Sequence, residues 1–109
     1  MKEFIICAAN YYNDGKVYEQ QPKNIEIGFV VCGRGHHNCI FVFAQIAGFP
    51  YNEFWQNVSN NEIQGFITNT NRFVNRKEAY HIAYSADQIT GPTKGCPTNN
   101  IGLTSEDLY

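Results

Sequence analysis

The stretch GFITNTNRFVNRKEAYHIAYSADQ, residues Gly65 to Gln88, decides the fold. Its first residues are aromatic or β-branched and predict a strand that covers residues 62–68. The short polar residues Asn69 to Asn71 then end the strand, because such side chains bond to nearby backbone and tolerate left-handed conformations. A helix follows within a few residues. The stretch therefore predicts a strand, a polar turn and a helix in succession.

The predicted helix has a clear start and a buried stripe. Asn75 is suited to cap its N-terminus, and Glu78 is placed to bond back to it, as in a capping box. Small and apolar residues at helical spacing predict the buried face: Ala79, Ile82, Ala83 and Ala86. Arg72 and Arg76 lie beside the turn, where free N–H groups and the positive end of a helix favour an anion.

The first third of the chain predicts the rest of the sheet. Phe4 to Tyr12 is β-prone, and Asn13-Asp14-Gly15 is typical of a hairpin turn, so a returning strand is predicted over residues 16–19. The apolar run 27–32 predicts another strand, which lies inside the sheet. With residues 62–68, these segments make a four-stranded antiparallel sheet.

The segments between the strands predict two more helices. Cys39 to Ala47 is almost entirely apolar, and the following Gly48 and Pro50 favour a helix that stops there. Because this helix is apolar on every face, we expect it to be buried on a second side, against another subunit. A short helix is predicted over residues 52–59, with Asn52 as its cap and Phe54, Trp55 and Val58 turned inward.

Beyond Gln88, the sequence predicts a loop over residues 90–102 and a last helical turn that starts near residue 104. No repeat or linker interrupts the 109 residues. The chain is therefore predicted to be a single α+β domain over residues 1–109, with a four-stranded antiparallel sheet and two main helices.

Composition excludes several classes of protein. The chain has 43% hydrophobic and 17% charged residues, as ordered globular domains do. Eight basic residues against ten acidic ones, with no basic run, argue against binding of long nucleic acid. We expect no membrane span, since no apolar run approaches about 20 residues. The start lacks the pattern of a signal peptide, so we expect the cytoplasm and free thiols at Cys7, Cys32, Cys39 and Cys96.

The polar turn at residues 69–71 and a second, glycine-containing turn at residues 33–38 predict a ligand pocket. Arginine presents a planar donor fork that matches phosphate, phenylalanine can stack on a base, and asparagine and histidine can bond ribose hydroxyls. The predicted ligand-binding residues are Arg34, His36, His37, Asn38, Phe66, Thr68, Asn69, Asn71, Arg72, Phe73 and Arg76.

The residues around the glycine-containing turn also suggest other chemistry. Cys32, His36, His37 and Cys39 are ligand types that suit zinc, but their spacing is not that of two separated ligand pairs. A Cys–His nucleophile or a pair of acid–base histidines would need an orienting carboxylate, and none stands at a recognisable spacing. We therefore expect no metal, no cofactor and no catalytic residue.

A wider pattern resembles a known family. It comprises Gly65-Phe66-x-Thr68, Arg72-Phe73-Val74-x-Arg76-x-Glu78-Ala79, Ala83, Ala86 and Gln88, the terminal Ser105-Glu106-Asp107-Leu108-Tyr109, and upstream Gly28-Phe29-Val30 with Arg34-x-His36-His37-Asn38. This pattern resembles the first Thoeris anti-defence protein family of phages. Two positions depart from it: Asn71 stands where a glycine is common, and Asp87 stands where a glycine often precedes the glutamine.

The resemblance implies a binding protein rather than an enzyme. Members of that family are phage sponges that sequester a TIR-produced glycocyclic ADP-ribose signal without cleaving it, so that the Thoeris effector stays inactive. They are homo-oligomers, either dimers or assemblies of dimers, and some hold cyclic oligonucleotides at a second site. The implied location is the cytoplasm of the infected bacterial cell. Two alternatives stay open: an enzyme that hydrolyses a cyclic nucleotide, and a phage protein that inhibits a host protein.

Overall fold

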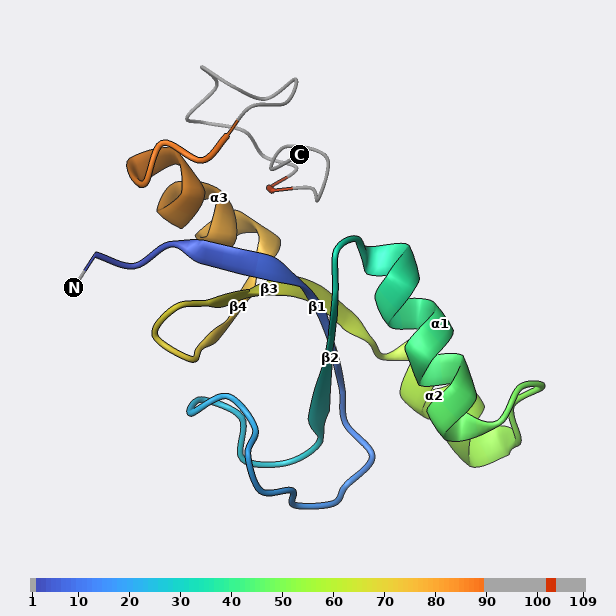
Figure 1. Ribbon diagram of the computed structural model, residues 1–109. Helices are drawn as coiled ribbons and strands as arrows, with labels where there is room; N and C mark the ends of the chain where they lie inside the picture. Colours follow the sequence, from blue (N-terminus) through green and yellow to red (C-terminus); the bar gives the residue numbers. More distant parts are fainter. Residues whose placement is uncertain (1, 90–101, 104–109) are drawn as a thin grey trace.

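A computed structural model describes residues 2–89 and 102–103 (Figure 1). A four-stranded sheet and three helices form a small α+β domain, as predicted. The elements are β1 (Ile5–Tyr12), β2 (Phe29–Gly33), α1 (His36–Ala47), α2 (Glu53–Asn60), β3 (Ile63–Thr68), β4 (Phe73–Asn75) and α3 (Arg76–Ser85). None of the helices in this described part is long and apolar enough to cross a bilayer.

The sheet has the order β2-β1-β3-β4, and every neighbouring pair is antiparallel. Ala8 of β1 lies opposite Gly33 of β2 on one side and opposite Phe66 of β3 on the other. Because successive residues of a strand face opposite sides, Ala8, Asn10 and Tyr12 share one face of β1. All three are fully buried. The core therefore packs against this face of the sheet.

The hairpin predicted around residues 13–15 is wrong, because residues 16–19 do not form a strand. Asn13 accepts a hydrogen bond from the Gly15 N–H, and Asp14 accepts one from the Lys16 N–H, so the chain turns away from the sheet. The place beside β1 is taken by β2, whose Phe29 and Val31 are buried. An apolar strand gains more from that position than the exposed segment 16–19 would. β2 is an edge strand, so the prediction that this apolar segment lies inside the sheet is wrong.

The fourth strand is instead β4, which sequence reasoning had placed in the turn before the helix. Asn71 adopts φ 63° in the tight connection, where its N–H donates to the Thr68 carbonyl. Asn75 ends β4 and caps α3 by accepting a hydrogen bond from the Glu78 N–H, at 2.8 Å. The predicted cap is confirmed, and the strand passes into the helix with no loop between them.

The predicted helical stripe is confirmed for Ala79 and Ala83, which are fully buried, with Tyr80 beside them. Ile82 and Ala86 are only half-buried, and Ala86 lies just past the end of α3. Asp87 follows α3 at φ 57°, so both positions where the resemblance has glycine adopt the left-handed region. Gln88 then bonds the backbone N–H and carbonyl of Ile5, each at 2.8 Å, and ties the end of the helix to β1.

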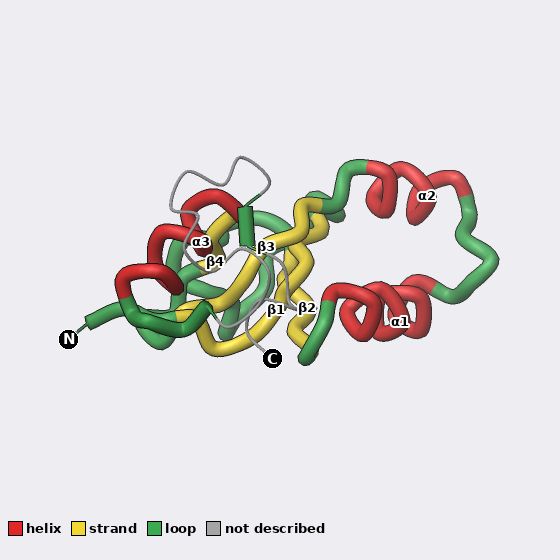
Figure 2. The backbone as a smooth tube through the Cα atoms, turned by 90° about the horizontal axis from the view of Figure 1, so that it is seen from above, coloured by secondary structure: helices red, strands yellow, loops and turns green. Residues whose placement is uncertain are grey.

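The helices α1 and α2 lie at the far end of the sheet from α3 (Figures 1 and 2). They meet through Phe43 of α1 and Trp55 of α2, whose rings contact edge-on. α1 begins at His36, earlier than predicted, and stops at Gly48, which has φ 80°. Asn52 caps α2 by accepting a hydrogen bond from the Trp55 N–H. Val58 is buried as predicted, but Phe54 is 49% exposed, so its inward prediction is wrong.

Two apolar clusters fill the core, one under each set of helices. The α3 cluster includes Ala8 and Phe66, whereas the α1–α2 cluster includes Tyr12 and Phe43, whose rings stack at 3.9 Å. Asn10 sits on β1 between Ala8 and Tyr12. The two clusters are therefore separated by a buried polar position. The loop predicted for residues 90–102 and the turn near residue 104 fall almost wholly outside the described residues.

Candidate functional site

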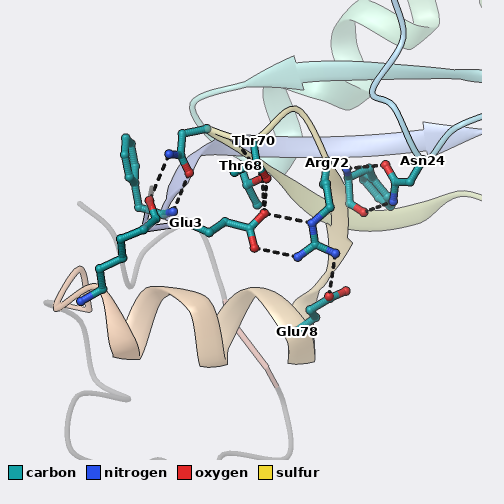
Figure 3. A network of polar contacts seen from close by, with 10 residues as sticks. Glu3, Asn24, Thr68, Thr70, Arg72 and Glu78 are labelled. Atoms are coloured by element: carbon teal, nitrogen blue, oxygen red, sulfur yellow. Dashed lines mark hydrogen bonds and ion pairs between the residues drawn. The ribbon is translucent and has the colours of Figure 1, made fainter.

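The first part of the predicted site is a closed network of charges around Arg72 (Figure 3). Its guanidinium binds both oxygens of the Glu3 carboxylate, with Nη2–Oε1 at 2.7 Å and Nε–Oε2 at 2.9 Å. Nη1 contacts Glu78 at 3.1 Å. Thr68 and Thr70 also donate hydrogen bonds to Glu3. Arg72 therefore already has two carboxylate partners.

This network explains the electrostatics of Glu3. The hydrogen bonds from Arg72, then from Thr70 and Thr68, lower the pKa of the carboxyl to about 2. The same pairing raises the pKa of Arg72. The network joins the start of the chain to the β3–β4 turn, and Asn69 reinforces that joint by accepting a hydrogen bond from the Phe4 N–H.

Asn71 and Phe73, two further predicted site residues, contact the β1–β2 part of the molecule. Asn71 accepts a hydrogen bond at its carbonyl from the Lys23 N–H. Phe73 is 8% exposed and lies against Tyr11, with ring centres 6.0 Å apart. The Asn24 side chain bonds both the N–H and the carbonyl of Phe73, as Figure 3 shows. These contacts hold the connection between β1 and β2 against β4.

Arg76 has a different environment, although it follows Arg72 by only four residues. Its Nη2 donates to the Gln64 carboxamide oxygen at 2.7 Å. Its Nε is buried and has no hydrogen-bond partner. A buried donor left unpaired costs about 1–3 kcal/mol, so native proteins seldom keep one without a reason. A bound anion would satisfy it.

Gln64 connects Arg76 to a chain of polar side chains in which Asn10 and Tyr12 of β1 are buried and Glu62 is half-buried. Its Nε2 donates to Glu62 at 3.3 Å. Glu62 in turn accepts from the Tyr12 hydroxyl at 2.7 Å and from the Asn10 side chain at 3.4 Å. Burial and the negative Glu62 keep the pKa of Tyr12 above its usual value, so the phenol stays a donor. The carbonyl oxygen of the Asn10 side chain is buried and unpartnered.

His36 borders the same region. Its Nε2 lies 2.9 Å from the Gly65 carbonyl oxygen, and its ring meets Phe66 edge-on at 5.1 Å. Because a carbonyl only accepts, Nε2 must carry the proton. Burial lowers the pKa of His36, with a contribution from the nearby charge of Arg76. Phe66 is fully buried, so its ring belongs to the core and to the support of His36.

The remaining predicted residues lie at the start of α1. His37, Asn38 and Arg34 are exposed. Asn38 accepts a hydrogen bond from the Gly35 N–H at 3.0 Å and so closes the first turn of the helix. The structure thus brings His36, Phe66 and Arg76 together and places Arg72 and Thr68 in the separate Glu3 network. Asn69 lies beside that network and bonds the backbone of Phe4.

Sequence reasoning missed Asn10, Glu62 and Gln64. The signal was present for Asn10, since it alternates with Ala8 and Tyr12 and so had to share their face. A polar residue at a buried strand position needs partners or a function. We call Asn10, Tyr12, Glu62, Gln64 and Arg76 the central polar cluster.

The cysteines form no metal site in the part of the chain that the structure describes, where no three His, Cys, Asp or Glu side chains are grouped to hold an ion. Cys7 and Cys32 are close enough for a thiol hydrogen bond, which lowers the pKa of Cys7 and raises that of Cys32. Cys39 is buried, and burial raises its pKa to about 11. Cys96 lies outside the described residues.

The edge strand β2 and helix α1 border a separate pocket of about 440 Å³. Its lining is Tyr18, Gln21, Phe29, Val30, Val31, Cys32, Val42 and Ile46. Other exposed apolar side chains lie on α1, on the connection after it and on α2: Ile40, Phe41, Phe49 and Phe54. We call this region, from β2 across α1 to Phe54, the apolar face.

Comparison with known proteins gives one match. No curated protein and no solved structure matches the chain. The model of one protein family matches residues 4–109, and that family is described as the phage T4 y16D protein. The match covers β1 through α3, and hence the central polar cluster and Arg72, but it begins one residue after Glu3. The chain therefore belongs to the phage T4 y16D protein family.

Proposed function

We propose that this phage protein is a sponge that captures a TIR-produced glycocyclic ADP-ribose signal, holds it uncleaved and so keeps it from the Thoeris effector. The observation that carries the proposal is the buried Nε of Arg76, which has no partner in the central polar cluster. A guanidinium with a free, desolvated N–H binds phosphate strongly, because little water competes for it. The diphosphate of the signal would supply the missing acceptor.

The backbone supports the resemblance on which the proposal also rests. Asn71 and Asp87 are the two positions where a glycine is common in the Thoeris anti-defence family, and both have positive φ here. Gln88, another residue of the pattern, fixes the chain after α3 to β1. Glycine is common at these two positions because the backbone there has positive φ. Asn71 and Asp87 adopt the same backbone conformation.

Self-association is part of the proposal. The apolar face leaves Phe41 69% exposed and Phe49 74% exposed, and it adjoins β2, which is an edge of the sheet. Large exposed apolar surfaces beside an unpaired strand edge are typical of interfaces. A homo-oligomer would cover them. Light scattering of the purified protein should give at least a dimer mass, and a monomer at high concentration would contradict this part.

The apolar face also favours a second candidate function, inhibition of a host protein. In that case the partner would cover the face instead of a second copy. Phe41→Ser separates the two, because it should dissociate an oligomer in one case and release a host protein in the other. A host partner that co-purifies in fixed stoichiometry with a monomeric chain would support the inhibitor.

The experiment that tests the sponge is capture and release. The purified protein is incubated with the product of a TIR enzyme, separated from unbound material and denatured, and the released molecules are identified by mass spectrometry. We expect intact cyclic ADP-ribose from the wild type and none from Arg76→Ala. Lys77→Ala is the matched control, since it removes the next, exposed cation of α3. A cleaved product would instead indicate a hydrolase, and no released nucleotide would overturn the proposal.

A further inference from the structure

Two of the cysteines lie on neighbouring strands and near each other. Cys7 belongs to β1 and Cys32 to β2, and the pairing of these strands sets Cys32 opposite Ala9. The Val30 N–H bonds the Gln21 side chain and so points away from β1. The backbone of Cys32, two residues further on, has the same orientation, so Cys32 and Ala9 form a non-hydrogen-bonded pair. Side chains of neighbouring strands come closest at such pairs.

Cys7 shares one face of β1 with Ala9. It precedes Ala9 by two residues in a stretch of β1 that pairs regularly with β3, so both side chains leave the strand on the same side. Cys7 is therefore the diagonal neighbour of Cys32, and the two thiols are close enough for a hydrogen bond. The sulfur atoms have to approach only from hydrogen-bond range to a covalent S–S distance of about 2 Å.

This pair is also accessible. Cys32 is exposed and Cys7 is half-buried, whereas Cys39 is fully buried and lies within hydrogen-bond reach of the Ala8 and Gly35 carbonyls. Cys32 also lines the pocket of about 440 Å³ beside β2, so a small oxidant can reach it. Of the three thiols that the structure describes, only Cys7 and Cys32 therefore combine mutual contact with access.

The two thiols are chemically unequal. The hydrogen bond from Cys32 lowers the pKa of Cys7 to about 7, so a large share of Cys7 is thiolate near neutral pH. The hydrogen bond to Cys7, together with burial, raises the pKa of Cys32, which stays a thiol. Oxidation-sensitive cysteines are accessible thiolates that stand next to a second cysteine able to resolve the first product. Cys7 and Cys32 match these two roles.

We propose that Cys7 and Cys32 form a reversible redox site, which hydrogen peroxide oxidises to a disulfide that fastens β2 to β1. The Cys7 thiolate attacks the peroxide: an S–O bond forms, the O–O bond breaks, and the hydroxide released takes a proton from solvent. The Cys32 sulfur then attacks the Cys7 sulfenic acid, so the S–S bond forms, the S–O bond breaks, and the hydroxide leaves with the Cys32 proton as water. Two thiols thereby reduce one peroxide to two waters, and a thiol reductant reverses the oxidation.

The disulfide would act on the edge of the sheet. β2 pairs with β1 alone, and it borders the pocket and the apolar face. A bond between residues 7 and 32 closes a loop that contains the whole β1–β2 connection, and such a loop stabilises the fold by restricting the unfolded chain. Intracellular disulfides are usually transient and serve redox sensing, which fits a reversible bond. The proposal does not depend on the sponge, because neither cysteine belongs to the central polar cluster.

Peptide mapping tests the pairing. The purified protein is treated with hydrogen peroxide, its remaining thiols are alkylated in denaturant, and it is digested with trypsin. Cleavage after Lys2, Lys16, Lys23 and Arg34 leaves Cys7 in peptide 3–16 and Cys32 in peptide 24–34. We expect these two peptides to be joined, lighter by two hydrogen atoms than their sum, with Cys39 alkylated. Oxidised Cys7 without the joined peptides, or joining of either peptide to that of Cys96, would overturn the proposal.

Thermal unfolding gives a second readout. The oxidised wild type should melt about 5–15 °C above the reduced protein, and dithiothreitol should remove the difference. Cys32→Ser should show no such shift and should stop at a Cys7 sulfenic acid that dimedone labels, whereas Cys96→Ser should behave as the wild type does. The same shift in Cys32→Ser, or no shift in a wild type whose peptides are joined, would show that the bond does not fasten β2.

Discussion

Arg72 and Arg76 come from the same turn of the chain, yet their surroundings differ in every respect that matters for binding. Arg72 is paired with Glu3 and Glu78 at the β3–β4 connection, whereas Arg76 has one amide partner and a buried Nε with none. Sequence reasoning treated the two as equals. The difference teaches that two arginines beside the same helix N-terminus can differ in whether the fold has already paired their donors.

The largest expected effect is on ligand binding. Arg76→Ala should weaken binding of the cyclic ADP-ribose signal by about 2–5 kcal/mol, because a phosphate in a desolvated site would lose its charged partner. Arg72→Ala should change it by less than about 1 kcal/mol, since that guanidinium is neutralised already. Calorimetric titration of both variants measures the contrast. Equal losses of affinity in the two variants would mean that Arg72 also contacts the ligand. No loss of affinity in either variant would mean that the ligand binds elsewhere.

The next largest expected effect is on the free energy of unfolding, and here Arg72 matters more than Arg76. Arg72→Ala should lower the free energy of unfolding by about 1–2 kcal/mol, because an ion pair with two hydrogen bonds to a partly buried carboxylate is lost. A double-mutant cycle with Glu3→Ala isolates the pair. Glu78→Ala is the control, and it should cost less than about 0.5 kcal/mol because that contact is exposed. A cycle energy near zero would mean that the network contributes no stability.

Low pH should reduce the stability that ionised Glu3 contributes through the Glu3–Arg72 network. The folded-state pKa of Glu3 is about 2, below the ordinary value of 4.5, so its stabilising contribution is present above that ordinary value and lost as the pH falls toward 2. The melting temperatures of wild type and Glu3→Gln should therefore converge between about pH 5 and about pH 2. A gap that stays constant over this range would show that the carboxylate is not held by the network.

The smallest expected effect is the pH dependence of stability that comes from His36, near Arg76. It appears at higher pH than the effect of Glu3. Burial lowers the pKa of His36 below 6.5, so the unfolded chain binds more protons and stability declines as the pH falls below that value. His36→Gln keeps a donor toward the Gly65 carbonyl but does not titrate. The variant should therefore lose less stability than the wild type between about pH 7 and about pH 5. Parallel pH profiles would contradict the buried neutral histidine.

Local signals in the sequence predicted much of this fold. Asn75 and Asn52 cap their helices as their residue type suggests, and Gly48 ends α1. The hairpin failed because the local preference of residues 13–15 for a turn says nothing about which strand lies next to β1. That choice depends on burial of Phe29 and Val31, a property of the assembled sheet.

The site was less predictable for the same reason. Glu3 neutralises Arg72 from 69 residues away, and no local pattern announces such a partner. Asn10 and Gln64 meet across two strands, and Gln64 then reaches Arg76. The residue types of the two polar turns predicted phosphate chemistry, but only the pairing of the strands distinguishes a donor that is occupied from one that is free.

The direct passage from β4 into α3 has a consequence for how this chain can vary. Asn75 ends the strand and Arg76 begins the helix, so no loop is present to absorb a change in length. One inserted residue would turn every later side chain of α3 by about 100° relative to the sheet. Arg76 would then leave Gln64, and Ala79 would leave the core. We expect chains of this family to vary in length elsewhere and to keep this junction free of insertions and deletions.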